Sequence, residues 1–159
     1  MLKRRRGDAA EEPVARRVLL ADTDPDACDL WARVIERADV PVDRCTDGAV
    51  LPVLRDTQYG CLVMNCTAPG AGAAGMQLVG TIRQSEEPQI RHVAVILVMP
   101  DDRNRLYAWG SRIDGMLVTP VTAERLVAEV VDVLDRPRSQ RGPHRSEQLA
   151  AARRGDPIH

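Results

Sequence analysis

The sequence contains no phenylalanine, and aromatic residues make up only 3% of its 159 residues. A core built from it must therefore consist of aliphatic and methionine side chains, which favours helices layered on a sheet over an aromatic-rich β-sandwich. The same scarcity argues against a platform on which single-stranded nucleic acid stacks. The hydrophobic content of 44% is nevertheless sufficient for one compact domain.

Long apolar runs and paired cysteines are also lacking. No stretch reaches the roughly 18 apolar residues of a membrane-spanning helix, and the basic residues 3–6 precede polar residues instead of the apolar core of a signal peptide. We therefore expect a cytoplasmic protein without membrane insertion. The four cysteines form no CxxC pair, so the sequence indicates neither a zinc site nor a disulfide framework. We expect no bound metal and no cofactor.

The formal net charge of −1 conceals two basic ends. Residues 1–16 carry five basic and three acidic side chains (+2), and residues 136–159 carry six arginines and two acids (+4), which leaves −7 for the segment between them. We interpret residues 1–16 as a flexible extension and residues 137–159, rich in Arg, Pro, Ser, Gln and Gly, as a disordered basic tail. The alternative is that these ends contact nucleic acid, an anionic membrane surface or an acidic partner.

Short apolar runs alternate with helical patterns across residues 17–136. Each run has the length of a buried parallel strand, and Asp24 before Pro25 and Thr122 are typical helix N-caps. The alternation predicts an α/β domain in which helices cover both faces of a parallel sheet. The expected strands are 17–22, 42–45, 61–65, 93–98 and 113–118. The first expected helix begins at Pro25, and the other four cover about 49–57, 76–84, 102–110 and 122–135.

The carboxyl ends of parallel strands meet at one edge of a sheet, where the ligand sites of such folds lie. Here those ends carry Asp22, Asn65, Met99 and Thr119. The order and spacing of LLADTDP, LVMN, AVILVMP and GMLVTPVT resemble the receiver domains of bacterial two-component response regulators across residues 17–136. The resemblance implies a doubly wound, five-stranded sheet with the flavodoxin-like strand order 2-1-3-4-5.

Receivers accept a phosphoryl group on an aspartate at the end of the third strand, and the resemblance puts Asn65 at that position. An amide is a poor nucleophile and cannot form an acyl phosphate. Receivers also hold magnesium with two acids after the first strand. Asp22 matches the first of these acids, but Thr23 replaces the second, and Asp24 is better explained as a helix cap. We therefore expect a remnant acidic pocket without metal chemistry.

Three further positions depart from the receiver pattern. Met99 stands where a hydroxyl residue senses the phosphoryl group, Thr119 replaces the lysine that neutralises it, and Met116 replaces the switch aromatic. Because these groups work as a unit, their joint loss predicts a pseudo-receiver that is not an enzyme. The simpler alternative is that Asp22 and Asn65 only satisfy backbone groups at the end of the sheet.

The resemblance also implies an output face formed by the fourth helix, the fifth strand and the fifth helix, through which receivers dimerise or dock partners. Tryptophan, tyrosine and arginine are the usual anchors of protein interfaces. We predict a homodimer or a partner complex through this face, although Trp109 could instead simply cover the sheet. The candidate interface residues are Arg105, Tyr107, Trp109, Arg112 and Arg125.

A glycine pattern follows the third strand. Gly70, Gly72 and Gly75 fit the dinucleotide fingerprint GxGxxG, but four residues, including Pro69, separate the strand from Gly70. We expect a flexible loop from Cys66 to Gly75 and keep a ligand loop as the alternative. The function that we predict is a stand-alone pseudo-receiver that acts through phosphorylation-independent protein association. The alternatives are a transcriptional regulator with basic tails on DNA and a small-molecule or nucleotide binder that uses residues 70–75.

Overall fold

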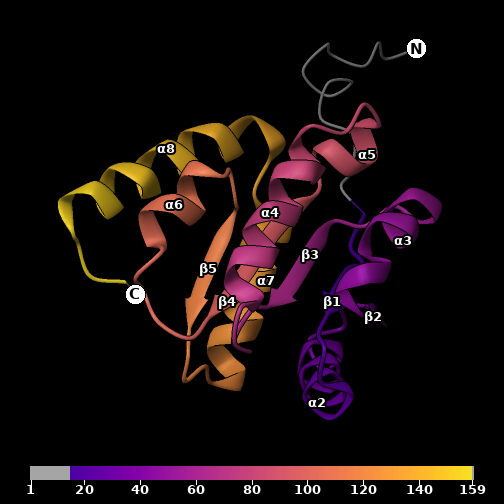
Figure 1. The fold of residues 1–159 in the computed structure, drawn as a ribbon. Helices are drawn as coiled ribbons and strands as arrows, with labels where there is room; N and C mark the ends of the chain where they lie inside the picture. Colours follow the sequence, from indigo (N-terminus) through magenta and orange to yellow (C-terminus); the bar gives the residue numbers. More distant parts are fainter. Residues whose placement is uncertain (1–14, 159) are drawn as a thin grey trace, which may run out of the picture.

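The computed structural model describes residues 15–158, and its centre is a five-stranded parallel sheet (Figure 1). The strand order is β2-β1-β3-β4-β5, so the expected fold class and strand order are confirmed. The strands are β1 (Val18–Ala21), β2 (Val42–Cys45), β3 (Cys61–Asn65), β4 (Ala94–Met99) and β5 (Gly115–Val118).

The three central strands are apolar and buried almost throughout, as expected for a sheet covered on both faces. β1 pairs with β2 and β3, and β4 lies between β3 and β5. In this register Asn65, the last residue of β3, pairs with Val98, one residue before the end of β4. The ends of β1, β3 and β4 therefore lie at the same edge of the sheet.

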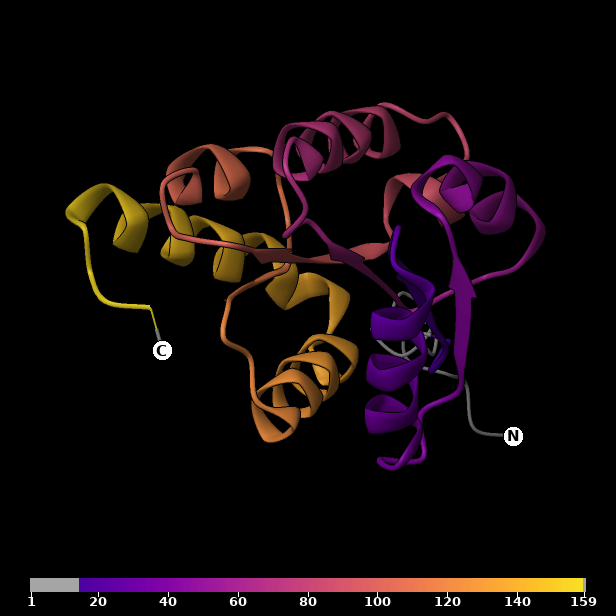
Figure 2. The same ribbon diagram turned by 60° about the horizontal axis from the view of Figure 1, so that its bottom comes forward.

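Helices cover both faces of the sheet, and each face has its own apolar core (Figure 2). One core lies beneath α3 (Val50–Asp56), α4 (Ala71–Arg83), α5 (Pro88–Arg91) and α6 (Arg105–Gly110). The other lies beneath α2 (Pro25–Glu36) and α7 (Ala123–Asp135), and a short 3₁₀ helix, η1 (Asp47–Ala49), precedes α3.

Two helix caps follow the sequence pattern. The Asp24 carboxylate accepts hydrogen bonds from the backbone N–H groups of Asp26 and Ala27, and the Thr122 hydroxyl accepts one from Arg125. Both residues thus satisfy donors that have no partner within the helix. The predicted boundary of the glycine loop is wrong, because α4 begins at Ala71 and includes most of that segment.

The C-terminal segment contains a helix, α8 (Arg138–Arg154), that packs along α6 (Figure 1). The expectation of a disordered tail is therefore wrong for these residues. No residue of α8 is fully buried, although Leu149 and Ala152 pack against the core. Apolar burial alone does not explain why this helix docks. Residues 1–14 of the predicted N-terminal extension lie outside the described residues.

An ionic cluster around Asp114 attaches α8 to the domain. Asp114 directly precedes β5, its side chain is 1% exposed, and it contacts the guanidinium groups of Arg83, Arg141 and Arg145. Arg141 and Arg145 both belong to α8, one turn apart, and each donates two hydrogen bonds to the carboxylate. Burial alone would raise the pKa of Asp114, but Arg141 and Arg145 outweigh it and hold that pKa below its ordinary value.

Candidate functional site

Asp22 and Asn65 meet at the carboxyl edge of the sheet. The Asn65 amide nitrogen donates to Asp22 Oδ2 at 2.9 Å, and the backbone N–H of Asp24 donates to Asp22 Oδ1 at 2.9 Å. The Asn65 amide oxygen accepts from the backbone N–H and the hydroxyl of Thr67, at 3.2 and 2.8 Å. Both carboxylate oxygens and both polar atoms of the amide therefore have partners inside the site.

This network leaves little for a magnesium ion. The only site carboxylate that matches the receiver pattern, Asp22, is 5% exposed and already accepts two hydrogen bonds. Asp24 points its carboxylate at the first turn of α2. Within residues 15–158 no group of three or more His, Cys, Asp or Glu side chains is arranged to hold a metal ion. The residues present do not fit the cation that receivers use.

The residues at the replaced positions do not converge on the pocket. Met99 is 2% exposed and packs beneath α4, since a Cβ placed on Gly72 would lie 3.1 Å from its terminal methyl carbon. The Thr119 hydroxyl donates to the carbonyl of Pro100 at 3.4 Å. Met116 is buried in the sheet. The pocket therefore lacks, among these side chains, a cation or a hydroxyl directed at Asn65.

A second acid lies near this edge and was missed by the sequence reasoning. Asp47 begins η1 after β2, and its Oδ1 atom is buried without a hydrogen-bond partner among residues 15–158. Burial, and to a smaller degree the charge of Asp22, raises the pKa of Asp47. An acid two residues after the second strand was the available signal, because that strand ends at the same edge.

The nearby thiols are protonated at neutral pH. Burial, together with the charges of Asp47 and Asp22, raises the pKa of Cys66 to about 12, and burial raises the pKa of Cys45 to about 11. A thiolate is the reactive form of cysteine, so these environments suppress nucleophilic chemistry. The acids at the strand ends thus make their surroundings less favourable for additional negative charge.

The glycines of the GxGxxG pattern have a packing role. Gly70 caps α4 with φ 77°, while Gly72 and Gly75 lie inside the helix. A Cβ on Gly75 would lie 2.6 Å from Cys66 Sγ, so only glycine allows α4 to approach the end of β3 this closely. These contacts explain the spacing of Gly72 and Gly75 without a nucleotide.

The candidate interface residues divide into two groups. Tyr107 is 68% exposed and Arg112 is exposed, whereas Arg105 and Trp109 are only 9% and 6% exposed. Trp109 makes an edge-to-face contact with His144 of α8, with ring centroids 5.9 Å apart. Arg105 and Trp109 are therefore covered by α8 and the residues after it, which fits the alternative that Trp109 covers the domain. The interface through this face stays a prediction.

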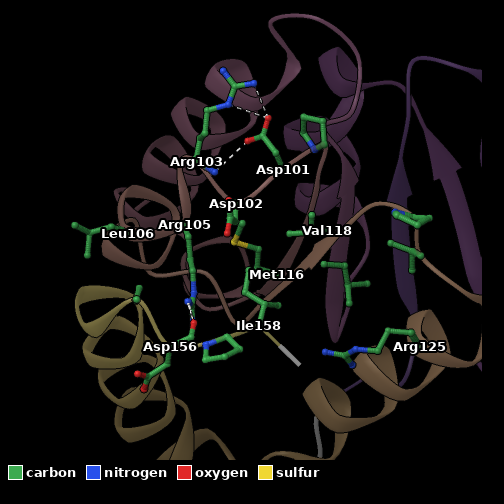
Figure 3. Close-up of a pocket in the computed structure, with 17 residues that line it drawn as sticks. Asp101, Asp102, Arg103, Arg105, Leu106, Met116, Val118, Arg125, Asp156 and Ile158 are labelled. Carbon is green, nitrogen blue, oxygen red and sulfur yellow. Dashed lines mark hydrogen bonds and ion pairs between the residues drawn. The ribbon is translucent and has the colours of Figure 1, made fainter.

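Arg125 lies on α7, half-buried, and forms an ion pair with Glu129 at 2.9 Å. It lines a cavity of about 810 Å³ between α6, β5, α7 and the residues after α8 (Figure 3). A second cavity of about 560 Å³ lies on the same face and shares Arg105, Met116 and Arg125 with the first. The sequence did not predict these cavities, because their walls come from three distant segments and include a tail expected to be disordered.

The basic tail is largely engaged in internal contacts. Arg141 and Arg145 contact Asp114, the Arg136 guanidinium donates to the Asp114 carbonyl at 3.5 Å, and Arg154 pairs with Asp156 at 2.8 Å. Four of the six arginines in residues 136–159 therefore bind acceptors within the chain. Within residues 15–158, no helix combines the length and the apolar character that crossing a bilayer requires.

Comparison with known proteins relates this chain to receivers through its structure. No protein-family model matches the sequence, and no curated protein matches it either. Among solved structures, the chemotaxis response regulator CheY4 of Vibrio cholerae is 16% identical with a TM-score of 0.65, and the match covers 76% of this chain and 99% of that one.

Two further response regulators give similar values. A putative response regulator of Chloroflexus aurantiacus is 20% identical with a TM-score of 0.67, and the match covers 77% of this chain and 99% of that one. The receiver domain of a response regulator of Bermanella marisrubri is 19% identical with a TM-score of 0.67, over 76% of this chain and 99% of that one. At these identities the likeness establishes the receiver fold.

Proposed function

We propose that this protein is a stand-alone regulatory module of the receiver type that acts by binding a protein partner and is not phosphorylated. The observation that carries the proposal is the pairing of Asn65 with Asp22 at the end of the sheet. The amide occupies the place of the expected phosphoacceptor, and its nitrogen is hydrogen-bonded to the only acid that matches the receiver pattern.

The chemistry of the surrounding side chains supports the same proposal. Transfer of a phosphoryl group needs an anionic nucleophile and positive charge near the transferred group. Asn65 is neutral, Asp22 already accepts two hydrogen bonds, and Thr119 brings a hydroxyl that donates to a backbone carbonyl elsewhere. With no covalent switch, a change of state requires a partner that binds one conformation more tightly than another.

The exposed side of α6 is the surface that we assign to the partner. Leu106 and Tyr107 are 49% and 68% exposed and adjacent in sequence, and the exposed Arg112 lies two residues after the end of the same helix. Large apolar and aromatic side chains beside an arginine are typical of interface centres. This surface is accessible while α8 stays docked, in contrast to Arg105 and Trp109.

Phosphorylation is tested by incubating the full chain with acetyl phosphate and magnesium and recording its intact mass. We expect no labile mass gain, while a receiver domain that carries the usual aspartate is labelled in the same experiment. A labile phosphate mapped to the peptide that contains Asn65 would overturn the proposal.

Partner binding is tested by crosslinking in extracts of the source cells, with purification of the tagged full chain. Replacing Tyr107 by Ser should remove specific partners, because it removes an exposed aromatic side chain from α6. The matched control is Leu30→Ser, which changes a similarly exposed residue (62%) on α2, at the opposite face of the sheet. Loss of the same partners in both variants, or in neither, contradicts the assigned surface.

A further inference from the structure

The larger cavity on the α6, β5 and α7 face has the character of a small-molecule site. We propose that it binds a ligand with an apolar body and one anionic group, a carboxylate or a phosphate, and that Arg105 recognises the anion. This ligand site does not require phosphorylation, and it shares only Leu106 with the partner surface assigned to α6. The proposal concerns a cavity distinct from both the Asp22 pocket and the glycine segment.

Arg105 is the principal observation. It is the first residue of α6 and is 9% exposed, yet among residues 15–158 its guanidinium forms no ion pair with a carboxylate. Its Nη1 donates to the backbone carbonyl of Asp156, and its Nε is buried without a hydrogen-bond partner in the part of the chain that the structure describes. A buried guanidinium without a counter-ion is strongly unfavourable, so this position calls for an anion that the described chain does not supply.

The acids around the cavity are committed or exposed. Asp101 pairs with Arg103 at 3.1 Å, and the Asp156 carboxylate pairs with Arg154 at 2.8 Å. Asp102 is exposed, where water screens its charge. None of these carboxylates neutralises Arg105, although all three line the same cavity.

The backbone carbonyl of Asp156 is the group that a ligand would replace. Figure 3 shows Arg105 extending from α6 toward Asp156, with Met116 and Ile158 beside it. A carbonyl offers a dipole, whereas a carboxylate or phosphate offers a full charge and several acceptor oxygens. Charge-assisted hydrogen bonds to guanidinium are the stronger ones and are often bidentate, which would also satisfy Nε.

The rest of the cavity fits an apolar body. Its volume of about 810 Å³ lies within the range of small-molecule sites. Apolar side chains from β5, from the segment before α7 and from the end of the chain form much of its wall, and Arg125 adds a second guanidinium, which already pairs with Glu129. The apolar lining residues include Leu106, Met116, Leu117, Val118, Val121 and Ile158.

Three probes with the same eight-carbon chain test the proposal: octanoate, octyl phosphate and octan-1-ol, titrated calorimetrically into the full chain. We expect at least one anion to bind with one molecule per chain, and at least tenfold more tightly than the alcohol. Binding of octanoate alone assigns a carboxylate ligand, and binding of octyl phosphate alone assigns a phosphate ligand. Equal affinity for the alcohol and the anions, or no binding of either anion, overturns the proposal.

Arg105→Met keeps the aliphatic stem and removes the charge. It should weaken anion binding at least tenfold and leave the alcohol unaffected. Arg103→Met is the matched control, because Arg103 lines the same cavity but is exposed and paired with Asp101. The anion affinity of this variant should stay within twofold of the wild-type value. Unchanged anion affinity in Arg105→Met overturns the assignment of Arg105.

A second readout covers the case in which Arg105→Met does not fold. Trp109 lines the adjoining cavity, and Trp31 is the only other tryptophan, so Trp31→Phe makes Trp109 the sole indole fluorophore. Titration of this variant with the anion that binds should change the Trp109 fluorescence, and the affinity obtained from this change should equal the affinity measured by calorimetry. Val121 lines the proposed cavity itself, so Val121→Glu adds a negative charge to its wall and should weaken anion binding at least tenfold. Unchanged anion affinity in Val121→Glu would place the ligand elsewhere and overturn the proposal.

Discussion

The amide nitrogen of Asn65 lies 2.9 Å from a carboxylate oxygen of Asp22, and this hydrogen bond joins the ends of β3 and β1. The Asn65 amide therefore stabilises the Asp22 carboxylate by donating a hydrogen bond, whereas a second carboxylate at position 65 would repel Asp22. A carboxylate at position 65 would lose the donor and add a second charge in a site of low exposure.

Asn65→Asp should therefore destabilise the protein at neutral pH, by about 1–3 kcal/mol for a lost hydrogen bond and an uncompensated acceptor. The repulsion raises the folded-state pKa of the carboxylate pair, so stability should recover as the pH falls and the pair takes up a proton. Urea unfolding at pH 7 and pH 5 measures both effects. The control Asn104→Asp changes an exposed residue before α6 and should leave the free energy of unfolding close to the wild-type value. An equally large loss of stability in this control would contradict the interpretation.

Two of the three glycines inside α4, Gly75 and Gly80, make a matched pair with opposite expectations. Gly75→Ala should destabilise by about 1–3 kcal/mol, because its Cβ would lie 2.6 Å from Cys66 Sγ and overpack the core. Gly80→Ala in the same helix meets nothing within 4 Å and should stabilise by about 0.5–1 kcal/mol through helix propensity. Thermal or urea unfolding measures both. Stabilisation by both substitutions would show that the contact with Cys66 relaxes freely.

The strands and the helix caps could be predicted because a local sequence signal indicates each of them. An apolar run such as residues 94–99 forms a buried strand in any α/β context, and Asp24 before Pro25 caps a helix by itself. Helix α8 could not be predicted in this way, since it has no continuous apolar face and depends on Arg141 and Arg145 reaching Asp114. That pairing becomes visible only when the start of β5 and the tail are placed in space.

In the candidate site, too, the features with a local sequence signal were predicted, and those that depend on distant segments were not. The position of Asn65 beside Asp22 was expected, because both residues end adjacent strands of a parallel sheet. The burial of Trp109 was expected only as an alternative and that of Arg105 was not expected, because the helix that covers them comes from a segment with a linker composition. The wrong expectation for the C-terminal segment therefore hid which residues of the predicted interface are covered, although a helix over about 102–110 was expected.

Asp114→Asn should release α8. The substitution leaves three arginines around a neutral amide, and breaking a buried ion pair in this way costs about 3–5 kcal/mol. We expect faster tryptic cleavage within residues 138–154 and faster amide exchange there. Asp135→Asn is the control, because its ion pair with Arg16 is exposed and should contribute about 0–1 kcal/mol. Unchanged cleavage in Asp114→Asn would mean that the other contacts of α8, such as the packing of Leu149 and Ala152 and the contact of His144 with Trp109, are sufficient to hold the helix.

The same carboxylate sets an acid limit on docking of α8. The pKa of Asp114 is lowered in the folded protein, so its contribution is fully present above the unfolded value of about 3.9 and is lost as the pH falls through the lower folded value. We therefore expect the Asp114 cluster to remain intact at pH 5. Far-UV circular dichroism and tryptic cleavage during an acid titration measure the release of α8. The His144→Gln variant keeps Asp114 and removes the titration of His144, so release of α8 at pH 5 in this variant would contradict the expected acid limit.

His144 adds a second pH dependence at a higher pH. Burial, and then the charge of Arg136, lowers the pKa of His144 below 6.5, and its ring contacts Trp109. The unfolded chain consequently binds the proton first as the pH falls below about 6.5, so the free energy of unfolding should decrease between pH 7.5 and the lowered folded pKa. His144→Gln should flatten this decrease, measured by urea unfolding at several pH values. His92, whose pKa burial and neighbouring arginines also lower, should preserve a residual slope that His92→Gln removes. An unchanged slope in the double variant would assign the pH dependence to other groups.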